Sequence, residues 1–529
     1  MVIRSTASNK LLRVFNASFF ILLSLVILSA ASVGLFYIPF FGEDGRESDI
    51  PLYTGILRLL LPIVFFALIS LLFIRLIRSA NSARLRRLRN RRFNTKAIFI
   101  SVGILLLIQL FTAFWLRMSP VTDVAILDSY AEKIVTENSF ACLDSDFNGH
   151  YIIWYQNNLP CLLIYVLIYK LSYFFTGNIS PYPMLVFNVL CINSAILMTV
   201  LIARRLFGEK KAIITLILCA LFTPYYTYTP YYYTDTFSIP FVAGAVYAFV
   251  AASQSKTRGK KALLFAICGA LCCIGSRIKG SVLILLFAMV IYLLFHFGIK
   301  RAAKAGGVIL LSFCVLLASF TAALKASNLI SDESSDRYQV PTAHWVMMGL
   351  GELGRFKYDD FMYTMRSDTR AERAKADIEE IGRRISQKGV GGMLFHLEQK
   401  AAWTYVDGTY NISHYIEWSE YETPLHALII KGRELRYPFF AYSFAYQMIL
   451  LAAMAYSGYS AFRRRKYAAT DLFRIAVFGA ILFFAVWEAN ARYLFNLTPL
   501  YILLATEGAF GFVEQHRKNG VSTLLNNTP

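Results

Sequence analysis

Long apolar runs recur along the chain, and short polar or basic segments separate them. About 20 consecutive apolar residues are enough to cross a bilayer as a helix. The pattern therefore predicts an all-α polytopic membrane protein with about 12 transmembrane helices. The predicted spans are Phe15–Pro39, Thr54–Ile77, Ala97–Leu116, Pro183–Ala203, Ala212–Thr229, Phe237–Ser253, Ala262–Ser276, Ser281–Phe297, Gly306–Leu324, Pro438–Ala461, Leu472–Trp487 and Tyr493–Phe512.

The positions of the basic residues predict which way each span runs. The segment Arg78–Lys96 contains six arginines between residues 84 and 92, and such clusters remain on the cytoplasmic side. The span Ala97–Leu116 then runs outward, and Asp123, just beyond it, faces the outside. Of the 529 residues, 57% are hydrophobic and 16% are charged. We therefore attribute the net charge of +20 to membrane topology and expect no nucleic-acid partner.

One apolar run, Leu159–Phe175, conflicts with this alternation if it crosses the membrane. Arg204 and Arg205, and every later basic cluster, would then lie outside. The run is near the lower length limit for a span and contains Lys170. We interpret it as an amphipathic or re-entrant helix on the outer surface. The other spans then alternate, and both termini are cytoplasmic.

The predicted spans divide the chain into four regions. Residues 1–96 form a two-helix membrane hairpin with a basic cytoplasmic loop, and residues 97–325 form a transmembrane core whose first outer loop covers residues 117–182. Residues 326–437 are an extracytoplasmic loop region, in which Asp368–Lys388 has a helical pattern. Residues 438–529 hold the last transmembrane helices and a cytoplasmic tail.

Two carboxylates and three cations are predicted at the outer ends of the spans. Asp123 and Asp235 are the carboxylates, and Arg277, Lys279 and Arg492 are the cations. Because basic residues are rare on the outer side, these three are candidates for binding an anionic group such as a lipid phosphate. The simpler interpretations are snorkelling side chains at helix ends, an N-cap role for Asp235, and a membrane-interface belt for the tyrosines around it.

The order and sidedness of several short motifs resemble the GT-C superfamily of membrane glycosyltransferases, which includes protein O-mannosyltransferases and aminoarabinose transferases. The matching pieces extend over about four fifths of the chain, and the first two spans are an addition to the pattern. No Trp-Trp-Asp-Tyr-Gly motif of the oligosaccharyltransferases is present. The pieces are Pro120–Asp123, Tyr155–Asn158, Arg204–Gly208, Tyr233–Thr236, Ile278–Gly280 and Arg492–Leu494.

The resemblance implies transfer of a sugar, with inversion, from a polyprenyl-phosphate donor to an extracytoplasmic glycan, lipid or protein. It implies a bacterial plasma membrane location, Asp123 as general base, and Asp235 as a residue that orients the acceptor or helps to bind a metal. Arg277, Lys279 and Arg492 would hold the donor phosphate. The sugar, the acceptor and any cofactor or metal remain open. Further candidate substrate contacts are Asp128, which could exchange roles with Asp123, His344, Tyr233, Glu488 and Tyr493.

Two other function classes stay open on the sequence alone. A transporter or flippase of lipid-linked saccharides would place charge inside the membrane, and Glu507 lies well inside a predicted span. A scaffold for assembly of the cell envelope would need neither Asp123 nor Asp235. The absence of a visible repeat and the charge at outer helix ends favour the enzyme.

Overall fold

Helices form all the regular structure of the described residues. The computed structural model describes residues 6–43, 50–80, 95–419, 421–433, 435–464 and 468–526, and in these ranges no strand occurs. The arginine cluster between residues 84 and 92 lies outside them. The N-terminal half contains α1 (Thr6–Ser32), η1 (Val33–Tyr37), α2 (Ile38–Phe41), α3 (Leu52–Ala80), α5 (Thr95–Trp115), α6 (Thr122–Glu137), η2 (Ala141–Asp144), η3 (Phe147–His150), α7 (Tyr151–Trp154), η4 (Gln156–Asn158), α8 (Leu159–Thr176), α9 (Tyr182–Phe207), α10 (Glu209–Leu221), α11 (Pro224–Thr227) and α12 (Thr234–Gln254). The C-terminal half contains α13 (Arg258–Ile278), η5 (Gly280–Val282), α14 (Leu283–His296), α15 (Ile299–Ser327), α16 (Asp332–Tyr338), α17 (Ala343–Gly349), η6 (Glu352–Gly354), α18 (Tyr358–Thr364), α19 (Arg370–Val406), α20 (Ile412–Ile416), η7 (Pro424–Leu428), α21 (Arg436–Arg464), α22 (Asp471–Val486), η8 (Ala491–Leu497) and α23 (Thr498–Asn526).

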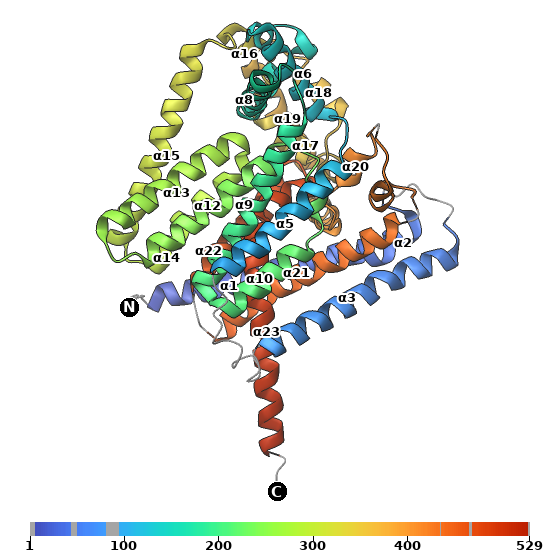
Figure 1. Ribbon diagram of the computed structural model, residues 1–529, viewed down its shortest axis with the longest axis vertical. Coiled ribbons are helices and arrows are strands. Elements are labelled where there is room, and N and C mark those ends of the chain that lie inside the picture. The colour runs from blue at the N-terminus through green and yellow to red at the C-terminus, as the bar shows by residue number, and fades with distance from the viewer. Residues whose placement is uncertain are drawn as a thin grey trace.

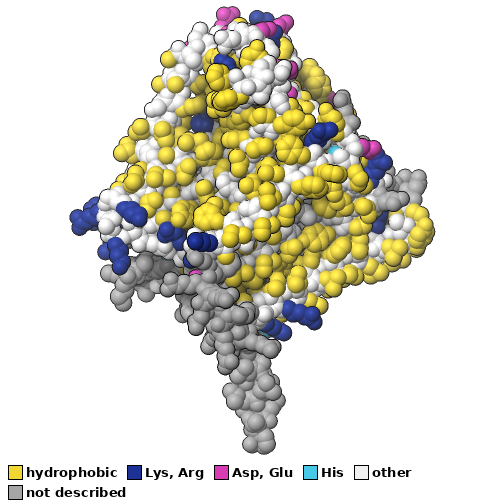
Figure 2. Space-filling model, viewed as in Figure 1, with side chains coloured by type: hydrophobic (Ala, Val, Ile, Leu, Met, Phe, Trp, Pro, Cys, Tyr) yellow, Lys and Arg dark blue, Asp and Glu magenta, His cyan; other side chains and the backbone are white. Residues whose placement is uncertain are grey.

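The predicted membrane spans correspond to helices. Within the described ranges, nine helices are long and apolar enough to cross a membrane. Eight of them coincide with predicted spans, and the ninth is the stretch Gln156–Thr176 that contains α8. The four other predicted spans are present as the shorter helices α10, α14 and α22 and as the first part of α23. Hydrophobic side chains cover most of the face shown in Figure 2, while Lys and Arg gather at its lower edges and Asp and Glu toward the top.

Helices α5 and α9 run antiparallel. At one end Arg204 of α9 donates a hydrogen bond to the hydroxyl of Thr95 (2.7 Å), and at the other Arg117, just after α5, donates one to the hydroxyl of Tyr182 (3.2 Å). The segment between them therefore returns the chain to the end it left, as our interpretation of Leu159–Phe175 requires. Figure 1 shows α6, α8, α16 and α18 gathered beyond this end of the long helices.

The tyrosine-rich segment differs from the prediction. Helix α10 ends at Leu221, whereas we expected a span as far as Thr229. Pro224 and the proline at position 230 interrupt the pattern, and the irregular backbone is held by side-chain amides. Gln109 of α5 donates to the carbonyl of Tyr225 (2.9 Å), and Asn188 of α9 donates to those of residues 228 and 229 (2.9 Å each). Irregular backbone at membrane depth must be satisfied inside the protein in this way.

The tyrosines of this segment are also not a membrane-interface belt. Tyr225, Tyr228 and Tyr231 are fully buried. The rings of Tyr228 and Tyr231 meet edge to face, with their centroids 5.9 Å apart, and Tyr231 stacks on Tyr415 at 4.3 Å. The segment is thus part of the protein core beneath the candidate site.

The predicted extracytoplasmic region contains α16 to α20. Its longest element, α19, begins with a capping box, in which Thr369 accepts from the backbone N–H of Glu372 while the Glu372 carboxylate accepts from the backbone N–H of Thr369. The end of α19 packs on α1, and Arg436, at the start of α21, pairs with Glu43 after α2. The region is therefore attached to the N-terminal hairpin as well as to the core.

Candidate active site

Asp123 lies in the first turn of α6, and both of its carboxylate oxygens accept hydrogen bonds from phenols. The hydroxyl of Tyr151 donates to Oδ1 (2.9 Å) and that of Tyr233 donates to Oδ2 (3.1 Å). Asn158 in turn donates to the Tyr151 hydroxyl (2.9 Å). Thr122, directly before Asp123, has φ of +52°, a strained value for a β-branched residue. Asp123 is half-buried and forms no ion pair with another described residue.

Asp235 lies in the first turn of α12 in a different environment. The N-cap of this helix is Tyr233, so the capping role considered for Asp235 is wrong. Its side chain is fully buried. One carboxylate oxygen lies 2.6 Å from Nζ of Lys279, just after α13, and the other lies 3.2 Å from Nε of Arg492 in η8. Three segments distant in sequence thus meet at one buried carboxylate.

Aromatic rings surround the two cations. The guanidinium of Arg492 donates to the Tyr231 hydroxyl (2.6 Å) and lies 4.9 Å from the ring centroid of Tyr233. The Lys279 ammonium lies 4.4 Å from the ring centroid of Tyr493. Cation–π contacts of this kind gain strength where water is excluded. Tyr233 therefore connects the cation pair with Asp123.

Glu488 is a third carboxylate at this site. It follows α22, is 8% exposed, and accepts a hydrogen bond from the Tyr493 hydroxyl (2.8 Å). Burial raises the pKa of Glu488, and the hydrogen bond from Tyr493 opposes that rise. The positive charge of Arg492 lowers the same pKa, and the negative charge of Asp123 raises it. Glu488 therefore interacts electrostatically with both Arg492 and Asp123. The structure thus brings together seven of the residues identified in the sequence: Asp123, Tyr233, Asp235, Lys279, Glu488, Arg492 and Tyr493.

Arg277 lies apart from this group. Its guanidinium lies 5.6 Å from the ring centroid of Phe320 on α15. Arg277 and Lys279 are two residues apart around the last turn of α13, so their side chains leave the helix in different directions. Of these two residues, Lys279 reaches Asp235 and Arg277 does not.

Asp128 and His344 also have partners elsewhere. The Asp128 carboxylate accepts a hydrogen bond from Tyr169 of α8, and burial raises its pKa to about 6. His344 is fully buried and hydrogen-bonds through Nδ1 to Thr364 (2.7 Å), whose hydroxyl donates to Asp377 (2.7 Å). Burial lowers the pKa of His344 to about 4. Neither residue contacts Asp123. The partner of the Asp128 carboxylate is Tyr169, whereas the partners of Asp123 are Tyr151 and Tyr233, so the two carboxylates lie in different environments.

The structure also identifies residues that the sequence did not single out. Tyr151, Tyr231 and Tyr415 each contact Asp123 or Arg492. Asn158 was part of a matching motif without an assigned role. Tyr231 belongs to the tyrosine run before Asp235 that we considered a membrane-interface belt, whereas nothing in the sequence marks Tyr151 and Tyr415 among the many tyrosines of the chain. Among the described residues, no group of three or more His, Cys, Asp or Glu side chains is arranged to hold a metal ion.

Comparison with known proteins identifies the family. Residues 13–509 match the family described as conserved hypothetical integral membrane protein. The chain belongs to this family. It is therefore an integral membrane protein, in agreement with the long apolar helices of the structure. No curated protein matches the chain.

Two solved structures are similar at low identity. One is ArnT from Cupriavidus metallidurans bound to undecaprenyl phosphate, with 13% identity, a TM-score of 0.37, and coverage of 79% of this chain and 76% of that one. The other is the archaeal oligosaccharyltransferase AglB from Archaeoglobus fulgidus, in complex with an inhibitory peptide and a dolichol-phosphate. It has 13% identity, a TM-score of 0.40, and coverage of 83% of this chain and 52% of that one. Both likenesses are remote.

Proposed function

We propose that the protein is a GT-C-type glycosyltransferase that moves a sugar from a polyprenyl-phosphate donor to an extracytoplasmic acceptor. The observation that carries this proposal is the pairing of two unlike environments at one end of a membrane helix bundle. Asp123 is a half-buried carboxylate with neutral partners, and Tyr233 connects it to the buried cations Lys279 and Arg492. A base beside a phosphate-binding pair is what this transfer requires.

The proposed chemistry assigns a role to each side. The acceptor hydroxyl oxygen attacks the anomeric carbon while Asp123 takes its proton. A new carbon–oxygen bond forms as the bond between the anomeric carbon and the phosphate oxygen breaks. The phosphate leaves with the bonding electrons, and Lys279 and Arg492 stabilise its charge. Attack from the face opposite to the leaving group inverts the configuration.

In this scheme Asp235 holds the cations and does not act on the acceptor. Two buried cations side by side repel each other, and each is costly to remove from water. Asp235 lies between Lys279 and Arg492, and its negative charge offsets both their mutual repulsion and the cost of removing them from water. Lys279 and Arg492 are then held in a fixed position in which they can bind a phosphate. Because its carboxylate is fully buried, Asp235 is a positioning residue.

The proposed location is a bacterial plasma membrane, with the site on the extracytoplasmic face. Asp123 lies at the opposite end of the bundle from Arg204 and Arg463, which supports this sidedness. It can be tested by replacing Lys210 with cysteine and labelling intact cells. We expect no labelling by an impermeant maleimide, and labelling from outside would reverse the topology.

The rival transporter hypothesis loses one of its supports. Glu507 was the intramembrane carboxylate that favoured it. In the structure Glu507 pairs with Arg474 (3.0 Å) and accepts hydrogen bonds from Ser457 and Thr470 (2.9 Å each). It thus has local partners and does not stand alone on a transport path.

A donor assay tests the proposed activity. The purified full-length protein in detergent is offered polyprenyl-phosphate-linked sugars, and release of free polyprenyl phosphate is measured. We expect turnover of at least one donor by the wild type and by Asp144→Asn, a control in the same loop, and turnover at least about 100-fold lower by Asp123→Asn. Equal turnover by Asp123→Asn would disprove the assignment of the base. Lipid scrambling in vesicles without turnover would favour the transporter.

A further inference from the structure

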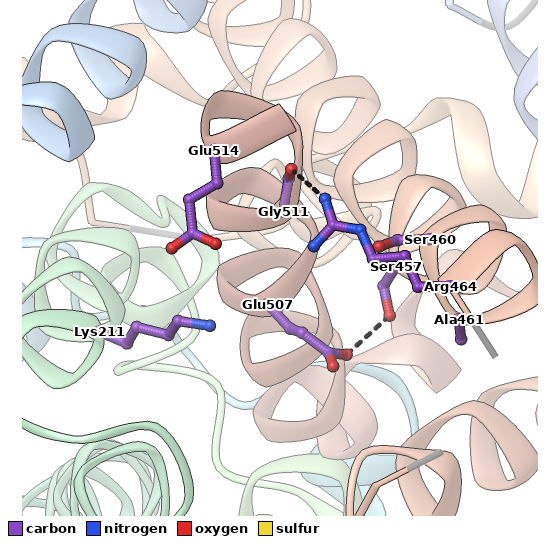
Figure 3. A pocket seen from close by; sticks show the side chains of 8 residues that line it. All are labelled: Lys211, Ser457, Ser460, Ala461, Arg464, Glu507, Gly511 and Glu514. Atoms are coloured by element: carbon purple, nitrogen blue, oxygen red, sulfur yellow. Dashed lines mark hydrogen bonds between the residues drawn. The ribbon is translucent and has the colours of Figure 1, made fainter. Parts of the chain in front are cut away.

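A second charged site lies at the end of the bundle opposite to Asp123. Helices α10, α21 and α23 line a cavity of about 130 Å³ there. A single buried water needs only about 10–15 Å³, so the cavity has room for a larger group. Figure 3 shows Lys211, Arg464, Glu507 and Glu514 lining this space from the three helices, with Arg464 donating a hydrogen bond to the carbonyl of Gly511 (3.3 Å).

The charges around the cavity do not neutralise one another. Glu507 already pairs with Arg474. Lys211, Arg464 and Glu514 form no ion pair with another described residue. The Lys211 ammonium is held between two rings, 5.3 Å from the centroid of Phe207 and 5.2 Å from that of Phe510. The cavity thus offers two cations and one carboxylate, separated in space.

The hydroxyl groups of the cavity add hydrogen-bonding capacity. Ser457 and Ser460 line it from α21. Ser457 is committed, because it donates to Glu507 and accepts from Arg474. Ser460 lies about one turn nearer the C-terminal end of α21, and its hydroxyl lies on the cavity wall. Two cations beside a hydroxyl suit a phosphate, and a carboxylate nearby suits an ammonium.

We propose that this cavity binds the headgroup of a phosphoethanolamine phospholipid. The phosphodiester would lie between Lys211 and Arg464, and the primary ammonium would face Glu514. The site lies between membrane helices at the basic end of the bundle, where headgroups of the opposite leaflet lie. Phe512 of α23 is exposed nearby and provides apolar surface for acyl chains. A headgroup with only negative charge would leave Glu514 beside a phosphate without a partner.

Native mass spectrometry of the full-length protein in detergent tests this proposal. Phosphatidylethanolamine, phosphatidylglycerol and phosphatidylcholine with identical acyl chains are titrated separately. We expect phosphatidylethanolamine to bind about tenfold more tightly than phosphatidylcholine, whose quaternary ammonium donates no hydrogen bond to Glu514. Equal affinity for the three lipids would overturn the proposal.

Variants locate the site and identify the source of the ligand. The double variant Lys211→Gln/Arg464→Gln should lower the affinity about tenfold or more, while the neighbouring control Arg463→Gln should not change it. Glu514→Gln should remove the preference for phosphatidylethanolamine over phosphatidylglycerol. Unchanged binding by the double variant, with its thermal unfolding intact, would overturn the assignment. Soluble O-phosphoethanolamine is the last probe. If it displaces phosphatidylethanolamine at concentrations equal to that of the lipid, the natural ligand is a soluble phosphoethanolamine and not a phospholipid.

Discussion

Two buried charge clusters lie at opposite ends of this bundle, and each contains a carboxylate that bridges two basic side chains. In the first, Asp235 meets Lys279 and Arg492. In the second, Asp471 at the start of α22 lies 2.6 Å from Nη2 of Arg474 and 3.0 Å from Nε2 of His296. By burial and ion pairing alone, the two clusters are alike.

The difference is in their neighbours. Asp471 and Arg474 are satisfied by protein groups, because Arg474 also pairs with Glu507 and donates to Ser457. The first cluster instead adjoins half-buried Asp123, whose carboxylate accepts hydrogen bonds from two phenols and, among the described residues, forms no ion pair. A buried ion pair therefore indicates structure in general. A half-buried carboxylate without a counterion beside such a pair is what indicates chemistry.

Replacing Asp123 by asparagine should have the largest effect. It removes the proposed base and leaves a side chain of the same size, so we expect turnover to fall about 10²- to 10⁴-fold. Thermal unfolding in detergent should change little, because Asp123 forms no ion pair with another described residue. Donor turnover and unfolding are measured on the same preparation. A loss of activity that only follows a loss of folded protein would mean that Asp123 is structural.

The two clusters can be compared directly with Asp235→Asn and Asp471→Asn. Each removes a buried carboxylate from a cationic partner, a change that costs about 3–5 kcal/mol. We expect both variants to unfold at lower temperature. Turnover per folded molecule should fall only for Asp235→Asn, because Lys279 and Arg492 lose their position. Equal turnover per folded molecule in both would remove the distinction between the clusters.

Tyr233→Phe tests the connection between Asp123 and the cation pair. The change removes one hydrogen bond to a charged group, worth about 1.5–3 kcal/mol, and keeps the ring beside Arg492. We expect kcat to fall about 10- to 100-fold with little change in the donor KM. Tyr169→Phe, which removes a phenol from Asp128 instead, is the matched control. A change confined to KM would place Tyr233 in substrate binding.

The smallest expected effect concerns pH and Asp128. Burial raises the pKa of Asp128 to about 6, above the usual value near 3.8. The folded state therefore holds a proton that the unfolded state has released, and its stability falls as pH rises between these values. Hydrogen exchange of α6 and α8, corrected for intrinsic rates, should show less protection at pH 7 than at pH 5. In Asp128→Asn this pH difference should disappear, and its persistence would assign the effect to another group.

Local pattern was sufficient for much of this protein. The length of the apolar runs predicted the helices, since a membrane requires about 20 apolar residues per crossing. The antiparallel pairing of α5 and α9 confirms that the segment between them returns to the same end. The positions of Asp123, Asp235, Lys279, Glu488 and Arg492 at that end were also predicted, because each follows or precedes a span directly.

Tertiary contacts decided the rest, because they depend on residues far apart in the sequence. Gln109 and Asn188 satisfy the irregular backbone after α10, so hydropathy alone extended that helix too far. The same long-range packing paired Asp235 with Lys279 and Arg492 and left Arg277 beside Phe320. The sequence by itself thus determined that Asp123, Asp235 and their neighbouring cations lie at the same end of the bundle. Only the folded structure decided which carboxylate is neutralised by cations and which is left free to accept a proton.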